Sequence, residues 1–230
     1  MYVPNYIPQP VEIPGNVALE RWNSKLVFLR RVTAWHLLSV GVVAGLVLLD
    51  LPKVTLWAGL IALILMIVGL DLLRIATRRT PWDLRISVAA FPAALIIVAE
   101  VLRTLRENGF PVWAPLFGLL SAVAYTLFCR RDFSFIGQYL LSMIVSEVAL
   151  AVVSISFGFG VARASWAMGA NAVYLTFYCY DLASLMSRRR LGEEPAAAVD
   201  LYRDVLNVFG WTLRCARHWK RHRIWTTPWP

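Results

Sequence analysis

The sequence predicts an all-α integral membrane protein, with six spanning helices around a central, partly re-entrant seventh helix. Its 230 residues are 59% hydrophobic and 16% charged, and the mean hydropathy is +0.60. This composition is too apolar for a soluble domain of this size. Apolar stretches of about 20 residues, the length that crosses a bilayer as a helix, recur along the chain. The connections between them are short, so consecutive helices should pack antiparallel in one bundle.

The chain divides into three parts. Residues 1–24 form a Pro-rich N-terminal arm, residues 25–215 a seven-helix membrane domain, and residues 216–230 a basic, aromatic C-terminal tail. We expect the two ends to be disordered unless a protein partner holds them. The six spans are predicted at about residues 32–50, 54–73, 86–102, 111–129, 133–157 and 164–186. A seventh stretch, at about 196–213, is less apolar because it carries three charged side chains, Asp200, Arg203 and Asp204.

Basic residues are distributed unequally between the two sets of connecting segments. With the N-terminus inside, they crowd the inner segments and are sparse in the outer ones. The positive-inside rule therefore places the N-terminus in the cytoplasm, or in its matrix or stromal equivalent. A re-entrant last helix would keep the basic tail on that same side and its charges away from lipid. The net charge of +9 then reflects contact with anionic lipid headgroups rather than with nucleic acid.

Asp181, near the end of the sixth apolar stretch, and Asp204, inside the seventh, define a candidate functional site. A carboxylate in hydrocarbon is costly unless it is paired, hydrated or protonated. Two neighbouring carboxylates cannot both ionise cheaply, so a proton or a hard cation would relieve their repulsion. Ca²⁺ prefers oxygen ligands and is the possible ion. No resident cofactor is expected.

Glu147 lies in the middle of the fifth predicted span and has two possible roles. It either lines a cavity as a ligand for a proton or cation, or pairs with an arginine. His36 is expected to be a hydrogen-bonded histidine of the bundle interior. The chain contains no Gly-rich phosphate loop, nucleophile elbow or zinc motif, so an enzyme is not expected.

Four stretches together resemble the Bax inhibitor family, also called the transmembrane Bax inhibitor motif proteins. Residues 26–38 are similar to the motif before its first helix, and Arg78-Arg-Thr-Pro-Trp-Asp-Leu84 to its basic loop before the third. Arg130-Arg-Asp-Phe-Ser-Phe-Ile-Gly137 resembles its "Lys-Lys-Asp-Leu-Ser…Gly" signature. Tyr180-Asp181 followed by residues 200–209 resembles its "Tyr-Asp" and "Leu-Tyr-Leu-Asp-Ile-Ile-Asn-Leu-Phe". Order and spacing agree over about residues 25–215.

The resemblance implies a calcium leak that is closed by a pH-sensitive latch of paired aspartates. By position these are Asp181 and Asp204. A basic residue at the cytoplasmic end of the second helix would pair with them, and here it is Arg78 or Arg79.

Two residues depart from the family's pattern at the latch. Arg203 stands where the family has a hydrophobic residue, and Asp200 where it has a small polar one. Asp200 and Asp204 share a helix face, with Arg203 close to both. An arginine does not deprotonate in proteins, so its pairing with a latch carboxylate would replace a titrating proton. Two functions therefore stay open: a pH-regulated calcium or cation leak channel, and a non-conducting accessory or scaffold subunit of a larger membrane complex, bound through the N- and C-terminal arms.

Overall fold

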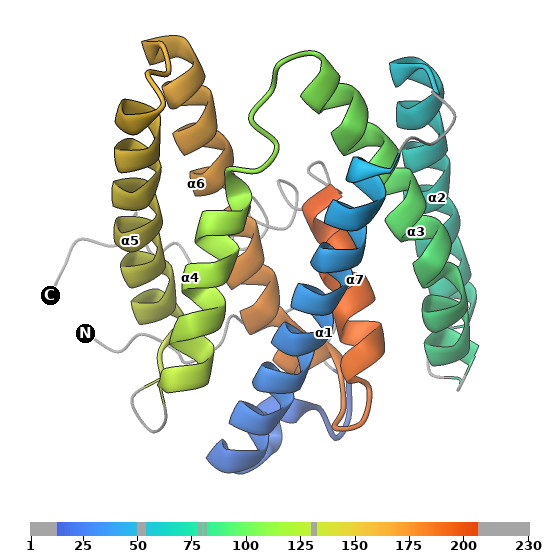
Figure 1. Cartoon of the computed structure of the whole chain (residues 1–230). Helices are drawn as coiled ribbons and strands as arrows, with labels where there is room; N and C mark the ends of the chain where they lie inside the picture. Colours follow the sequence, from blue (N-terminus) through green and yellow to red (C-terminus); the bar gives the residue numbers. More distant parts are fainter. Residues whose placement is uncertain (1–12, 50–53, 78–79, 81, 130–132, 207–230) are drawn as a thin grey trace, which may run out of the picture.

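A computed structural model describes residues 13–49, 54–77, 80, 82–129 and 133–206 of the chain, and within them all regular structure is helical (Figure 1). A short 3-10 helix, η1 (Val17–Leu19), precedes seven α-helices. Their bounds are α1 (Trp22–Leu48), α2 (Leu56–Thr77), α3 (Trp82–Glu107), α4 (Pro115–Phe128), α5 (Phe135–Ser156), α6 (Val161–Arg188) and α7 (Glu194–Leu206). The end of the predicted seventh helix, after residue 206, and the basic tail at 216–230 lie outside the described residues.

Helices α1 and α7 occupy the centre of the bundle. The α4, α5 and α6 helices pack together on one side and α2 with α3 on the other, as Figure 1 shows. Helix α1 contacts α3, α4 and α7, while α7 contacts α1, α3 and α6. Every residue from 196 to 202 is buried. The described part of the seventh helix therefore has the central position that the sequence predicts.

Much of the outer surface is apolar, which suits a membrane protein. On α5, for example, Ile144, Val148, Val152 and Ile155 are all more than half exposed. Among the described residues, three helical segments are long and apolar enough to cross a bilayer: Trp22–Leu48, Val88–Glu107 and Phe135–Ser156. Two shorter apolar segments, Leu56–Met66 and Pro115–Phe128, accompany them. The all-α membrane class is confirmed, and the number of six spans stays a prediction.

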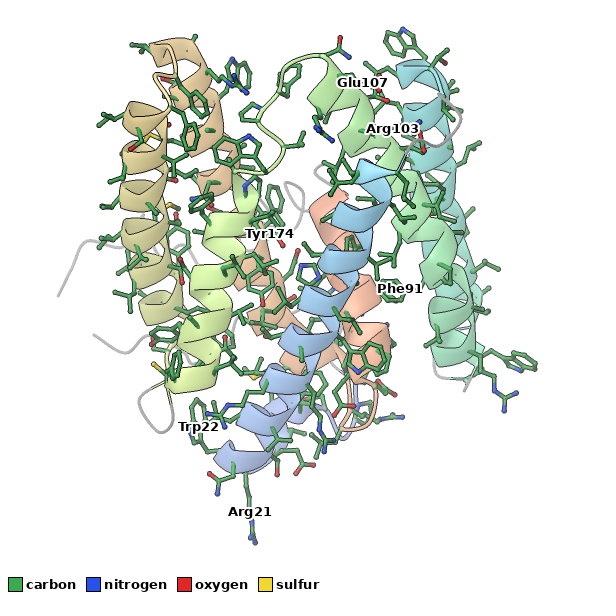
Figure 2. All side chains as sticks on the ribbon, in the orientation of Figure 1. Arg21, Trp22, Phe91, Arg103, Glu107 and Tyr174 are labelled. Atoms are coloured by element: carbon green, nitrogen blue, oxygen red, sulfur yellow. The ribbon has the colours of Figure 1, made fainter. Side chains whose placement is uncertain are left out.

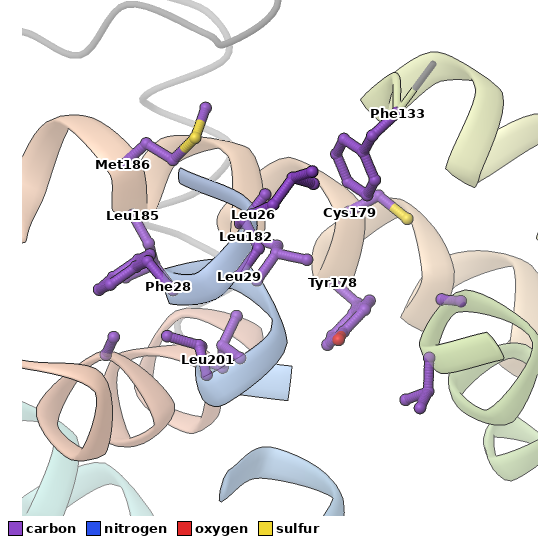
Figure 3. Close-up of a cluster of buried hydrophobic side chains, with 14 of the residues drawn as sticks. Leu26, Phe28, Leu29, Phe133, Tyr178, Cys179, Leu182, Leu185, Met186 and Leu201 are labelled. Carbon is purple, nitrogen blue, oxygen red and sulfur yellow. The ribbon is translucent and has the colours of Figure 1, made fainter. Parts of the chain in front are cut away.

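The largest core cluster joins α1, α6 and α7 (Figure 3). Leu29 of α1, Leu182 of α6 and Leu201 of α7 are fully buried in it. Fully burying a leucine contributes about 1.5–3 kcal/mol. This cluster therefore holds α7 against α1 and α6, and it fixes the part of α6 that carries Asp181.

The segment before α1 is part of the bundle from residue 13 onward. The backbone N–H groups of Ile13 and Val17 donate to the carbonyls of Ser187 (3.2 Å) and Arg189 (3.0 Å), and the Val17 side chain is fully buried. Carbonyls at the C-terminal end of a helix have no partner within that helix, so they are available to this segment. The sequence placed residues 13–24 in the N-terminal arm. In the structure, Ile13 and Val17 pack against the end of α6, and α1 already begins at Trp22.

Candidate functional site

Asp181 lies in the buried half of α6. Its exposed fraction is 0%, and its neighbours Tyr178, Leu182 and Leu185 belong to the central core. The Asp181 carbonyl accepts a hydrogen bond of 2.9 Å from the Ser184 hydroxyl, one turn further along the helix. The structure therefore places the Asp181 side chain in the buried interior of the bundle.

The other residues of the predicted latch lie at the limit of the described structure. Asp204 and Arg203 belong to α7, but their side chains are outside the described residues, as are Arg78 and Arg79 altogether. Whether the Asp181 and Asp204 carboxylates meet, and which arginine contacts them, stay predictions.

Asp200 has an arginine partner that the sequence did not suggest. The Arg189 Nε donates to the Asp200 Oδ2 at 2.7 Å, and both side chains are 2% exposed. A second carboxylate, that of Glu193, lies 3.9 Å from the Arg189 Nη1. The short α6–α7 connection brings these residues together, because Arg189 directly follows α6 and Asp200 is on the second turn of α7. This buried ion pair gives Asp200 a permanent counter-charge.

A row of polar side chains on α1 faces α6 and α7. The Thr33 hydroxyl lies 3.2 Å from the Tyr178 hydroxyl, and the His36 Nε2 lies 2.8 Å from the Tyr174 hydroxyl. Ser39, the third member, donates to the hydroxyl of Tyr202 on α7 at 2.9 Å. Figure 2 shows Tyr174 in the interior of the bundle.

The row confirms His36 as a buried, hydrogen-bonded histidine. Its tyrosine partners were missed by the sequence reasoning. A signal was available, because Thr33, His36 and Ser39 recur every three residues in the otherwise apolar part of α1 that follows Arg31, and so share one face. We call these six side chains of α1, α6 and α7 the tyrosine seam.

Glu147 is held by an amide, and none of its contacts in the described chain is with an arginine. The Asn171 Nδ2 of α6 donates both to the Glu147 Oε1 and to the Ser146 Oγ, each at 2.8 Å. The Asn171 Oδ1 accepts from the Gly118 N–H of α4 at 2.9 Å. The described partner of Glu147 is thus an amide, and both predicted roles, pairing with an arginine and a role as a ligand, stay predictions.

The fold and the site together define a polytopic helical membrane protein with buried carboxylates on α6 and α7. The chain is similar to the BI1-like protein of Arabidopsis thaliana, with 29% identity over 212 residues that cover 86% of this chain and 81% of that protein. Protein LIFEGUARD 3 of the same plant is 29% identical over 107 residues, 45% of this chain and 43% of its own. An uncharacterized membrane protein of Vibrio cholerae is 28% identical over 110 residues, 44% and 48% of the two chains. These last two matches span less than half of either relative.

These similarities confirm the resemblance that the four sequence stretches indicated. The chain is a divergent relative of the Bax inhibitor family. No protein-family model matches it, and no solved structure does.

Proposed function

We propose that this protein is a pH-regulated leak channel for Ca²⁺ or another cation, closed by a latch of Asp181 and Asp204. The observation that carries the proposal is the complete burial of Asp181 on α6, the helix that packs against α7. An ionisable residue inside a membrane bundle is expensive to maintain and marks an ion or proton pathway by default.

The helix geometry supports placing the two aspartates at a similar depth. Helices α6 and α7 are joined by a short connection and run back along each other (Figure 1). At 1.5 Å per residue, Asp181 lies about 10 Å from the end of α6 and Asp204 about 15 Å from the start of α7. Helical periodicity puts position 204 on the same face of α7 as Ala197 and Leu201, which pack in the central core.

The chemistry follows from two carboxyl groups in one buried place. When they share a proton or pair with a basic residue such as Arg78 or Arg79, the central helices are held together and the path is closed. When that sharing changes with pH, repulsion between the carboxylates favours separation of α6 and α7 and admits a cation that binds oxygen. Leak would then be coupled to pH.

A non-conducting accessory or scaffold subunit is the second candidate, and the Arg189–Asp200 ion pair favours it. This pair is buried at the corner between α6 and α7, and its guanidinium has no proton to lose in the physiological range. A permanent charge pair next to the latch, together with Arg203, would fix the two helices without a pH response.

Ca²⁺ flux into liposomes that contain the purified protein tests both functions. For the channel, flux should change between about pH 6 and about pH 8, because loss or gain of a proton shared by the two carboxyls opens or closes the latch. Asp181→Asn and Asp204→Asn should each abolish that change. The exposed carboxylate of Glu107 at the end of α3 offers a matched control, since Glu107→Gln should leave the pH response intact.

Arg203→Leu separates the two functions further. If Arg203 neutralises the latch, the wild type should conduct weakly at every pH, and the leucine variant should gain both flux and pH dependence. Robust pH-dependent flux from the wild type would exclude the scaffold function. Absence of flux from both the wild type and Arg203→Leu would exclude the channel.

A further inference from the structure

Residues 13–20, which we call the strap, are bound at the end of α6 before the chain enters α1. The backbone N–H groups of Ile13 and Val17 donate to the carbonyls of Ser187 and Arg189 at 3.2 and 3.0 Å. Figure 1 shows the strap, drawn in blue, at the same end of the bundle as the α6–α7 connection. The strap is therefore attached to the corner at which the chain turns from α6 into α7.

One apolar side chain of the strap enters the core of the bundle. Val17 is fully buried and belongs to the largest core cluster, together with Leu185 of α6 and Ala197 of α7. Leu19, two residues further along, is 75% exposed. Burial of apolar surface at Val17 therefore favours the docked position of the strap, whereas Leu19 contributes little to it.

A tight turn sets the direction of the strap. Gly15 has a φ of +69°, a left-handed conformation that glycine adopts without strain. The Asn16 Nδ2 donates to the Ile13 carbonyl at 2.8 Å across this turn. The Arg190 Nε, from the α6–α7 connection, donates to the Pro14 carbonyl at 3.1 Å. The turn and the corner thus hold each other by hydrogen bonds in both directions.

Arg189 connects the strap to α7. Its carbonyl accepts the hydrogen bond from the Val17 N–H, and its guanidinium forms the buried ion pair with Asp200 at 2.7 Å. The backbone of this residue is therefore fixed by the strap and its side chain by α7. Undocking of the strap would remove one partner of the Arg189 carbonyl and loosen the backbone from which the guanidinium reaches Asp200.

We propose that the strap positions Arg189 for its pair with Asp200 and thereby keeps the α6–α7 corner closed. While the strap is docked, the end of α6 is held against the first turns of α7. When it undocks, the corner opens locally and the remainder of the bundle stays folded. This positioning role does not depend on ion conduction, and only an effect of the strap on leak would rest in addition on the proposed function.

Hydrogen–deuterium exchange of the full-length protein in lipid nanodiscs tests the proposal. Val17→Asn removes the buried apolar side chain of the strap, so amides of residues 187–200 should exchange about tenfold faster. Amides of residues 142–150, in the middle of α5, should keep their wild-type rates. Leu19→Asn is the matched control, because Leu19 is exposed, and it should leave exchange at the corner unchanged.

Gly15→Ala is a milder variant that acts on the turn of the strap alone. Nothing lies within 4 Å of the new Cβ, so the change adds only the strain of a left-handed alanine. Exchange at the corner should rise about fivefold. Gly109→Ala introduces the same kind of strain in the α3–α4 connection, where φ is +84° and no atom lies within 4 Å of the new Cβ. It should not change exchange at the corner.

A double variant tests the route through Arg189. If the strap acts by positioning Arg189 for Asp200, Val17→Asn should add little to the faster exchange that Asp200→Asn already causes. Independent effects would instead multiply, and that result would overturn the link between the strap and the ion pair.

Two further results would contradict the proposal. One is unchanged exchange at the corner in both Val17→Asn and Gly15→Ala. The other is an equal rise throughout α4, α5 and α6, which would mean general destabilisation of the bundle. Ca²⁺ flux of the same variants is a separate readout. Flux that rises together with corner exchange would support a role of the strap in the latch, whereas absence of flux from the wild type and all variants would count against the channel alone.

Discussion

The Arg189 guanidinium and the Asp200 carboxylate form an ion pair of 2.7 Å in which both side chains are 2% exposed. The pair joins the end of α6 to the second turn of α7. It lies where the chain reverses direction, so it controls how the central helix enters the bundle.

Breaking this pair from one side should destabilise the protein strongly. Asp200→Asn leaves the buried Arg189 with only the more distant Glu193 carboxylate, 3.9 Å from its Nη1, which should lower the free energy of unfolding by about 3 kcal/mol. The matched control is Arg31→Gln, since the Arg31–Glu194 pair spans 3.6 Å and its arginine is 66% exposed, and it should cost at most about 1 kcal/mol. Denaturant unfolding in detergent measures both. Equal losses would mean that burial of the Arg189–Asp200 pair does not matter.

Helix α4 should tolerate no side chain at Gly118. A Cβ there would clash with the Asn171 Oδ1 and would lie 2.6 Å from the Leu175 Cγ. Gly118→Ala should therefore cost about 1–3 kcal/mol through overpacking. Gly41→Ala is the control, because nothing lies within 4 Å of its new Cβ and alanine favours the helix by about 1 kcal/mol. A Gly118→Ala protein as stable as wild type would contradict the close α4–α6 crossing.

Removing one hydroxyl from the tyrosine seam should loosen α1 from α6. Tyr174→Phe takes away the partner of the buried His36 Nε2, and a buried polar group left unsatisfied costs about 1–3 kcal/mol. Tyr139→Phe should cost less, since the Tyr139 hydroxyl bonds Thr176 at 3.4 Å, beyond the usual range for two hydroxyls. Melting temperatures of the two variants provide the comparison. The seam would lose its structural role if Tyr139→Phe were the more damaging change.

Thiol labelling should decide the side of the membrane on which the tail lies. With a membrane-impermeant reagent, we expect Cys215 to react from the same side as a cysteine introduced at the exposed Arg190. Cys179 is buried and Cys129 half-buried, so Cys215→Ser should remove most of the signal. Labelling from the opposite side would establish a seventh full crossing.

The apolar stretches predicted the helices well but located their ends less well. The third span was expected at about 86–102, whereas α3 runs from Trp82 to Glu107. Hydropathy detects only the part of a helix that suits hydrocarbon, and α3 continues with charged residues such as Arg106. The fourth span was expected from 111, but α4 begins at Pro115, a residue favoured at the first helical position.

Residues of the candidate site could be predicted only where one residue is unusual by itself in its sequence context. Asp181 could be identified because a carboxylate in an apolar stretch is unusual in itself. The partners of Asp200 and Glu147 could not, since Arg189 looked like one more loop arginine and Asn171 is on a different helix. The Arg189–Asp200 and Asn171–Glu147 contacts both depend on how the helices are arranged in space, and a single sequence does not give that arrangement directly.

The docking of Ile13 and Val17 on the end of α6 has a consequence for biogenesis. Ile13 and Val17 are synthesised well before Ser187 and Arg189, whose carbonyls they bind. Until α6 is complete, Val17 lacks the contacts that bury it, and this end of the bundle is unfinished. Such long-range contacts form late in folding. A chain interrupted before α6 would therefore leave the N–H groups of Ile13 and Val17 without their partners and the Val17 side chain exposed. Quality control could use this exposed segment to distinguish incomplete from complete molecules.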